Sequence, residues 1–141
     1  MENLITSLQI ENDELRKQIT VNEETIKKIH TLSFRLDQLI VYYNDDILQV
    51  TDQSDPLSVP ESHRFYRQYI EFNSGLTLSL ICGTRAYCTL GESFEIAIWN
   101  SGQEEGYRND LYEGNNEYNT LGHVTIDQLQ HYFNVCINNR P

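Results

Sequence analysis

The sequence predicts an α+β protein, in which a long N-terminal coiled-coil helix precedes a small antiparallel β-sheet and a C-terminal helix. Three observations support this prediction. A heptad repeat runs from Met1 to Ile47, apolar and polar residues alternate in short segments of the middle of the chain, and helical periodicity returns near the C-terminus. The chain of 141 residues is therefore divided into a helical oligomerisation segment (1–48), a linker (49–64) and a small α+β domain (65–141).

The N-terminal heptads hold mostly Ile at position a and Leu or Ile at position d. Such a repeat favours a coiled coil, and a polar Asn12 at position a favours two strands in register. We therefore expect a homo-oligomer that forms through this helix. The positions expected in its seam are Ile5, Leu8, Asn12, Leu15, Ile19, Ile26 and Ile29.

The apolar stripe of this segment widens after Ile29. A wider stripe is typical of a helix that packs on a globular core. Two arrangements stay open for residues 1–43: one continuous helix, or a helical hairpin that breaks near residues 20–22, with Asn22 capping the second helix. The residues that widen the stripe are Leu32, Leu36, Leu39, Ile40 and Tyr43.

Residues 49–64 are rich in Asp, Ser and Pro, and the two prolines exclude a regular helix, which predicts a linker. The segments 65–72 and 76–82 flank Asn73-Ser74-Gly75 and predict a hairpin. A short strand is expected at 86–90.

Residues 94–99 carry the strongest strand pattern, with Phe94, Ile96 and Ile98 expected on one face. Residues 120–124 are expected to return to the sheet edge. The last helix begins with a capping box, Thr125 and Gln128, and its apolar face is Ile126, Leu129, Phe133, Cys136 and Ile137.

The net charge of −11 opposes binding to nucleic acid, so no direct nucleic-acid partner is expected. No apolar run approaches the roughly 20 residues of a membrane span, and the chain does not start like a signal peptide. We therefore expect no membrane partner and a cytoplasmic location, where its three cysteines stay reduced.

No arrangement of residues predicts catalysis or metal binding. The four histidines are scattered, the cysteines form no CxxC pair, and no glycine-rich phosphate loop is present. A nucleophilic pair of Cys88 and His123 remains an alternative, although nothing in the sequence activates it. The chain is expected not to be an enzyme, with no catalytic residue, no metal and no cofactor.

Ligand binding is the better-supported activity. Residues 83–87 and 99–112 place arginines, aromatic rings and side-chain amides outside the strands. A nucleotide is recognised by these groups, through stacking of its base, hydrogen bonds to its edge and contacts to its phosphate. Alternatively, the arginines pair with local acids such as Glu92 or Asp110, and Trp99 packs on the sheet. The candidate ligand-binding residues are Arg85, Tyr87, Trp99, Asn100, Tyr107, Arg108 and Asn109.

The C-terminal two-thirds of the chain resembles small phage-encoded immune-evasion proteins in the segments EFNSGLTLSLICG, SFEIAIWNS and LGHVTIDQL. In size and layout it is similar to the Thoeris anti-defence proteins, which sequester cyclic nucleotide immune signals. The resemblance implies a non-catalytic oligomer that holds a cyclic ADP-ribose derivative or a cyclic oligonucleotide at a subunit interface.

These observations lead to the hypothesis of a phage-type binding protein that sequesters a cyclic nucleotide signal and so blocks host defence. A first alternative is an acidic inhibitor of a basic host protein, as in several anti-CRISPR proteins. A second alternative is a phage structural or assembly protein.

Overall fold

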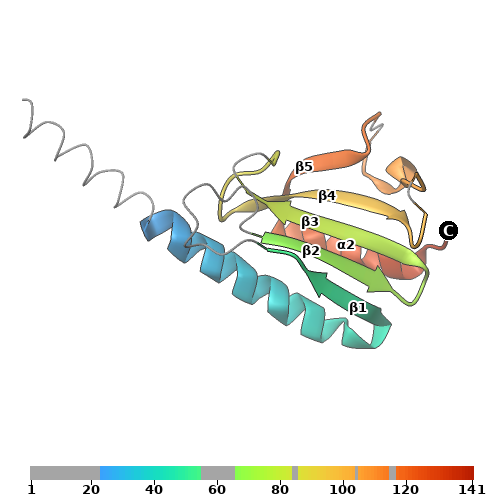
Figure 1. Cartoon of the computed structure of the whole chain (residues 1–141), viewed down its shortest axis with the longest axis horizontal. Helices are drawn as coiled ribbons and strands as arrows, with labels where there is room; N and C mark the ends of the chain where they lie inside the picture. The colour runs from blue at the N-terminus through green and yellow to red at the C-terminus, as the bar shows by residue number, and fades with distance from the viewer. Residues whose placement is uncertain (1–22, 55–65, 84–85, 104, 115–116) are drawn as a thin grey trace, which may run out of the picture.

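The computed structural model describes residues 23–54, 66–83, 86–103, 105–114 and 117–141. They form a five-stranded antiparallel sheet in the order β1-β2-β3-β4-β5, with an N-terminal helix and the C-terminal helix α2 (Figure 1). This layout confirms the predicted α+β class. The strands are β1 (Ile47–Asp52), β2 (Tyr66–Phe72), β3 (Leu76–Cys82), β4 (Ser93–Asn100) and β5 (Thr120–Thr125). The N-terminal helix covers 23–42 in the described part, α2 is Ile126–Asn138, and two 3-10 helices are η1 (Asn44–Asp46) and η2 (Asn109–Leu111).

Each strand of the sheet pairs with the next strand along the chain. The predicted hairpin of β2 and β3 is confirmed, and Gly75 in its turn has a φ of 96°, which favours glycine. The expected alternation in β4 is also confirmed, because Phe94, Ile96 and Ile98 are fully buried on one face. Residues 120–125 return to the sheet as β5, as expected.

The capping box of α2 forms as predicted. The hydroxyl of Thr125 accepts a hydrogen bond from the Gln128 backbone N–H at 3.4 Å, and the Gln128 side chain accepts one from the Thr125 N–H at 3.0 Å. These two bonds satisfy backbone donors that the first helical turn would otherwise leave free. The buried face of the helix contains Ile126, Leu129, Tyr132, Phe133 and Cys136.

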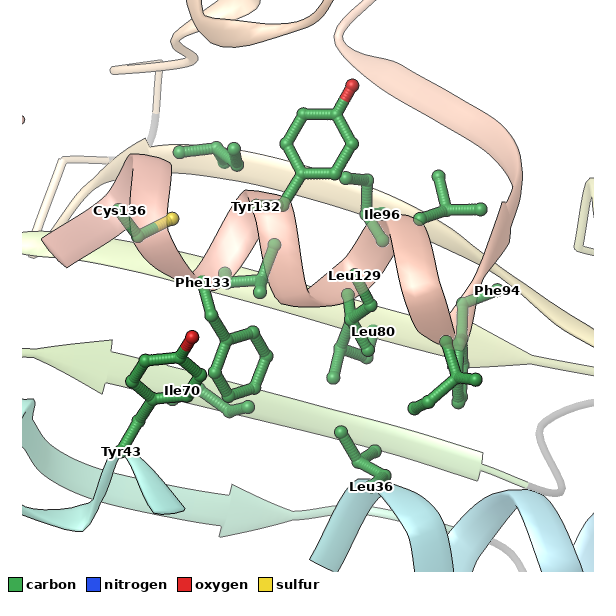
Figure 2. Packing of buried hydrophobic residues seen from close by; sticks show 14 of the residues in the cluster. Leu36, Tyr43, Ile70, Leu80, Phe94, Ile96, Leu129, Tyr132, Phe133 and Cys136 are labelled. Atoms are coloured by element: carbon green, nitrogen blue, oxygen red, sulfur yellow. The ribbon is translucent and has the colours of Figure 1, made fainter. Parts of the chain in front are cut away.

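Both helices pack on the same face of the sheet and share one hydrophobic core (Figure 2). The N-terminal helix contributes Leu36, and Tyr43 follows at its end. The ring of Phe133 from α2 lies 5.6 Å from the ring of Tyr43 and 5.6 Å from that of Phe72 on β2. The second half of the N-terminal helix therefore belongs to the folded domain, as the widening of its apolar stripe predicted.

The predicted bounds of the helical segment (1–48) and of the linker (49–64) were wrong where the two meet, because the helix ends at residue 42. Residues 47–52 form β1, which pairs with β2 in a register that places Val50 opposite Ile70. An edge strand forms ladder hydrogen bonds on one side only and stays largely exposed, so its polar sequence resembles that of a loop. The strand expected at 86–90 is also absent, since residues 86–88 form bends and residue 90 lies in a turn.

The expected oligomer seam lies mostly outside the described residues, as does the choice between a continuous helix and a hairpin. This applies to Ile5, Leu8, Asn12, Leu15 and Ile19. Ile29 is only 5% exposed within the single chain, where the loop at Gly91 packs on the helix, so it is not available to a partner helix. Ile26, one turn earlier, is 37% exposed.

Candidate functional site

The face of the sheet that points away from the helices carries a contact between two aromatic rings. Tyr69 on β2 pairs with Ser79 on β3, and Trp99 on β4 pairs with Thr77 on β3. The ring centroids of Tyr69 and Trp99 are 5.6 Å apart, at an angle of 61°. Because the two residues flank β3, the rings meet above that strand, where the small side chains of Thr77 and Ser79 leave room for them.

A short hairpin arm after β4 adds a third ring. The Asn100 N–H donates to the Gly106 carbonyl at 2.8 Å, and the Arg108 N–H donates to the Ile98 carbonyl at 2.8 Å. This pairing places Tyr107 opposite Trp99, with ring centroids 6.0 Å apart. Tyr69, Trp99 and Tyr107 thus form a continuous set of rings, here called the aromatic row.

A cavity of about 410 Å³ opens beside the aromatic row, lined by Trp99, Gly102, Gln103 and Tyr107. This volume lies within the range of small-molecule sites, about 300–1,000 Å³. Tyr107 is 40% exposed, so its ring is accessible from solvent. The arm passes close to itself at Gly106, where only glycine fits, because a Cβ there would lie 2.9 Å from the Cβ of Gln103. The arm therefore presents two aromatic faces and a side-chain amide to one hollow.

Arg67 supplies a positive charge at the other end of the aromatic row. Its Nε donates to the Tyr69 hydroxyl at 2.9 Å, and its guanidinium carbon lies 5.4 Å from the Tyr69 ring centroid. Within the described ranges, no carboxylate lies at ion-pair distance from this guanidinium. Its Nη2 also donates to the Tyr69 hydroxyl, so the guanidinium is held beside stacking rings, an arrangement suited to a phosphate group.

Arg108, by contrast, is occupied by contacts within the protein. Its guanidinium donates to both carboxylate oxygens of Asp110, at 3.1 and 3.0 Å, to Oδ1 of Asn100 at 3.3 Å and to the carbonyl of Arg140 at 2.6 Å. The hydrogen bonds from Arg108 lower the pKa of Asp110, and the pKa of Arg108 is raised in return. Arg108 and Asn100 were expected to contact a ligand, but their hydrogen bonds instead tie the base of the arm to the C-terminus.

Tyr112 anchors the segment that follows the arm. Its hydroxyl accepts from the Ile98 N–H at 3.0 Å and donates to the Asn119 carbonyl at 2.7 Å. Burial raises the pKa of this hydroxyl well above its usual range, so it remains protonated and keeps its donor. Asn109, another expected ligand contact, donates from Nδ2 to Oδ1 of Asn119 at 3.1 Å.

The loop before β4 does not join the site. The Tyr87 N–H donates to the Glu95 carboxylate at 3.0 Å, and its carbonyl accepts from the His123 N–H at 2.8 Å, which places Tyr87 at the Glu95 end of β4, away from Trp99. Arg85 lies outside the described residues. The structure therefore brings together only Trp99 and Tyr107 of the candidate ligand contacts, with Asn100 and Arg108 as their support.

Sequence reasoning missed Arg67 and Tyr69. The alternation in β2 could have identified them. Ile70 and Phe72 point into the core, so Tyr69, and Arg67 two residues before it, must point to the other face. The registers of β2 with β3 and of β3 with β4 then place Tyr69 and Trp99 on the same face, on the two strands that flank β3.

A second cavity, of about 240 Å³, lies between β5 and α2. His131 there contacts the Glu113 carboxylate at 3.2 Å, and His123 lines the same cavity with a φ of 53°. In the part of the chain that the structure describes, no three His, Cys, Asp or Glu side chains are grouped so that they could hold a metal ion.

Comparisons of the chain with models of protein families, with curated proteins and with solved structures found no match. Among the described residues, no helix combines the length and the apolar character that a membrane span requires. The site must therefore be interpreted from its own geometry and chemistry.

Proposed function

We propose that this protein is a non-enzymatic binding protein that sequesters a small nucleotide on the outer face of its sheet. The observation that supports this proposal is the aromatic row, with a cavity at Trp99 and Tyr107 and the guanidinium of Arg67 beside Tyr69. Rings of this kind stack on a nucleobase, the Gln103 amide can reach its edge, and Arg67 can contact a phosphate.

A small ligand fits this site better than a nucleic-acid strand. The chain carries 21 acidic and 10 basic residues, so its field repels a polyanion along most of the surface. A cyclic nucleotide brings only a few charges and presents its base directly to the aromatic row. We propose a cyclic ADP-ribose derivative or a cyclic oligonucleotide as the ligand, bound in the cytoplasm of a host cell, where its removal would block defence against phage.

The alternative of an acidic inhibitor would require carboxylates gathered on one surface. In the described part, several carboxylates instead pair with a basic side chain, among them Glu92 with Lys28 at 3.0 Å and Asp127 with Arg35 at 3.3 Å. Ligand sequestration is therefore the function that we favour.

Replacing Trp99 with alanine should weaken nucleotide binding by about 5- to 150-fold, because stacking of one base on an aromatic ring contributes about 1–3 kcal/mol. Calorimetric titration with cyclic ADP-ribose isomers and with cyclic di- and trinucleotides identifies the ligand and measures this change. Tyr42→Ala is the matched control, since Tyr42 is 76% exposed on the N-terminal helix, on the other side of the sheet. If none of these nucleotides produces heat with micromolar wild-type protein, the proposed function is wrong.

We also propose that the chain forms a homo-oligomer through the N-terminal heptads. Ile26→Asp should lower the mass of the particle in solution, because it places a charge in the expected seam at a side chain that the fold leaves partly exposed. Thr31→Asp adds the same charge at an exposed heptad position remote from the seam and should leave the mass unchanged. Light scattering coupled to size exclusion gives both masses, and equal masses for wild type and Ile26→Asp would exclude a seam at this position.

A further inference from the structure

Two cysteines lie against each other where β3 ends. Cys82 is the last residue of the strand and is fully buried, whereas Cys88 lies in the following loop and is half-buried. Their Sγ atoms are 3.9 Å apart, and both are free thiols. The third cysteine, Cys136, is buried in α2 and belongs to the hydrophobic core.

The contact between the two sulfurs makes them chemically different. The hydrogen bond between the two sulfurs lowers the pKa of Cys88, whereas the same bond, together with burial, raises the pKa of Cys82. The partial burial of Cys88 and the nearby Glu95 carboxylate act in the opposite direction on Cys88. The thiolate is the reactive form of cysteine, so Cys88 is the more nucleophilic of the pair, and it is also the one that solvent reaches.

The position of Cys88 allows the sulfurs to come closer. A disulfide bond is about 2.05 Å long, so the two Sγ atoms would have to approach by roughly 2 Å from their distance of 3.9 Å. Cys88 lies in a bend outside the sheet, where its N–H donates to the Ala86 carbonyl at 2.9 Å. A shift of Cys88 towards Cys82 therefore breaks no pairing between strands.

We propose that Cys82 and Cys88 form a thiol modification site, which a hydroperoxide converts to an intramolecular disulfide. The Cys88 thiolate attacks one peroxide oxygen, and the O–O bond breaks, giving a sulfenic acid on Cys88 and releasing hydroxide, or an alkoxide from an organic peroxide. The Cys82 thiol then attacks the Cys88 sulfur, the S–O bond breaks, and water leaves with the Cys82 proton. In sum, two thiols are oxidised to one disulfide and one peroxide is reduced.

Peptide mapping without reduction tests this site directly. Trypsin cleaves after Arg67, Arg85 and Arg108 and so leaves the three cysteines on three peptides, 68–85, 86–108 and 109–141. After folded protein is treated with hydrogen peroxide, we expect the first two peptides to be linked, with a mass loss of about 2 Da on the intact chain that dithiothreitol reverses.

Three variants sharpen the test. Cys136→Ala should give the same link as wild type, whereas Cys88→Ser should give none. Cys82→Ala should leave a sulfenic acid on Cys88, which dimedone traps. The proposal is overturned if folded wild-type protein keeps both thiols free under peroxide, if the link runs to the peptide that holds Cys136, or if Cys82 and Cys136 are oxidised as fast as Cys88. Cys88 lies in a loop, so Cys88→Ser is expected to fold. Its result therefore tests the proposal even if Cys82→Ala does not fold.

Discussion

Replacing Phe133 with alanine should lower the free energy of unfolding by about 3–5 kcal/mol, which is the range for removing a fully buried phenylalanine. The ring points from α2 toward Tyr43 at the end of the N-terminal helix (Figure 2). Its centroid is 5.6 Å from that of Tyr43 and 5.6 Å from that of Phe72 on β2. Its removal therefore takes contacts from three elements at once and leaves a cavity that none of them can fill alone. Urea denaturation followed by circular dichroism measures the change.

Phe34→Ala is the matched control for this experiment. It deletes the same side chain from the N-terminal helix, but at a position where the ring is 62% exposed. A surface substitution of this kind usually changes stability by no more than about 0.5 kcal/mol. Equal destabilisation by the two variants would contradict the core that is described above.

Leu36→Ala should destabilise the protein by about 2–5 kcal/mol, because Leu36 is fully buried and joins the N-terminal helix to the core. If the helix were only an oligomerisation segment that leaves the sheet domain independent, this substitution would leave the unfolding of the sheet unchanged. A single transition at a lower urea concentration is the expected result, since helix and sheet then unfold together.

Val41→Ala on the same helix is the control for Leu36→Ala. Its side chain is largely exposed, so a change of no more than about 0.5 kcal/mol is expected. Both variants should be compared at several protein concentrations, so that any effect on oligomerisation is separated from the effect on the core. A separate transition for the sheet domain, unaffected by Leu36→Ala, would show that the helix does not stabilise it.

If the proposed function is right, stability and binding can be changed separately, because the core lies on one face of the sheet and the aromatic row on the other. On β4, Ile98 points into the core and Trp99 points to the other face. The two residues are neighbours in the chain, yet a substitution at one should reduce stability and at the other ligand affinity. Equal urea midpoints for Trp99→Ala and wild type would therefore show that a loss of affinity in the calorimetry is not caused by unfolding.

Local patterns in the sequence were sufficient for most of the fold. The hairpin of β2 and β3, the alternation in β4 and the capping box at Thr125 were all predicted, because each depends on residues that are close in the chain. The widening of the apolar stripe after Ile29 likewise predicted the half of the helix that packs on the core.

The site was predicted only in part, because its chemistry depends on distant pairs. Arg108 and Arg67 look alike in the sequence, but Arg108 is held by Asp110 and by the carbonyl of Arg140, 32 residues away, whereas Arg67 lies beside Tyr69. The pair of Arg108 with Asp110 is local and was open as an alternative, whereas the contacts of Arg108 with Arg140 and of Tyr69 with Trp99 join residues that are far apart in the chain.

The sequence by itself thus determined the α+β class and the elements whose periodicity or capping is local, as well as Trp99 and Tyr107 as candidates for stacking. The tertiary structure alone decided that residues 47–52 are a strand and that Tyr69 completes the aromatic row. The physical reason is the same in both cases. An edge strand and a contact across β3 are stabilised by partners that lie far away in the chain, and these partners are known only when the sheet register is known.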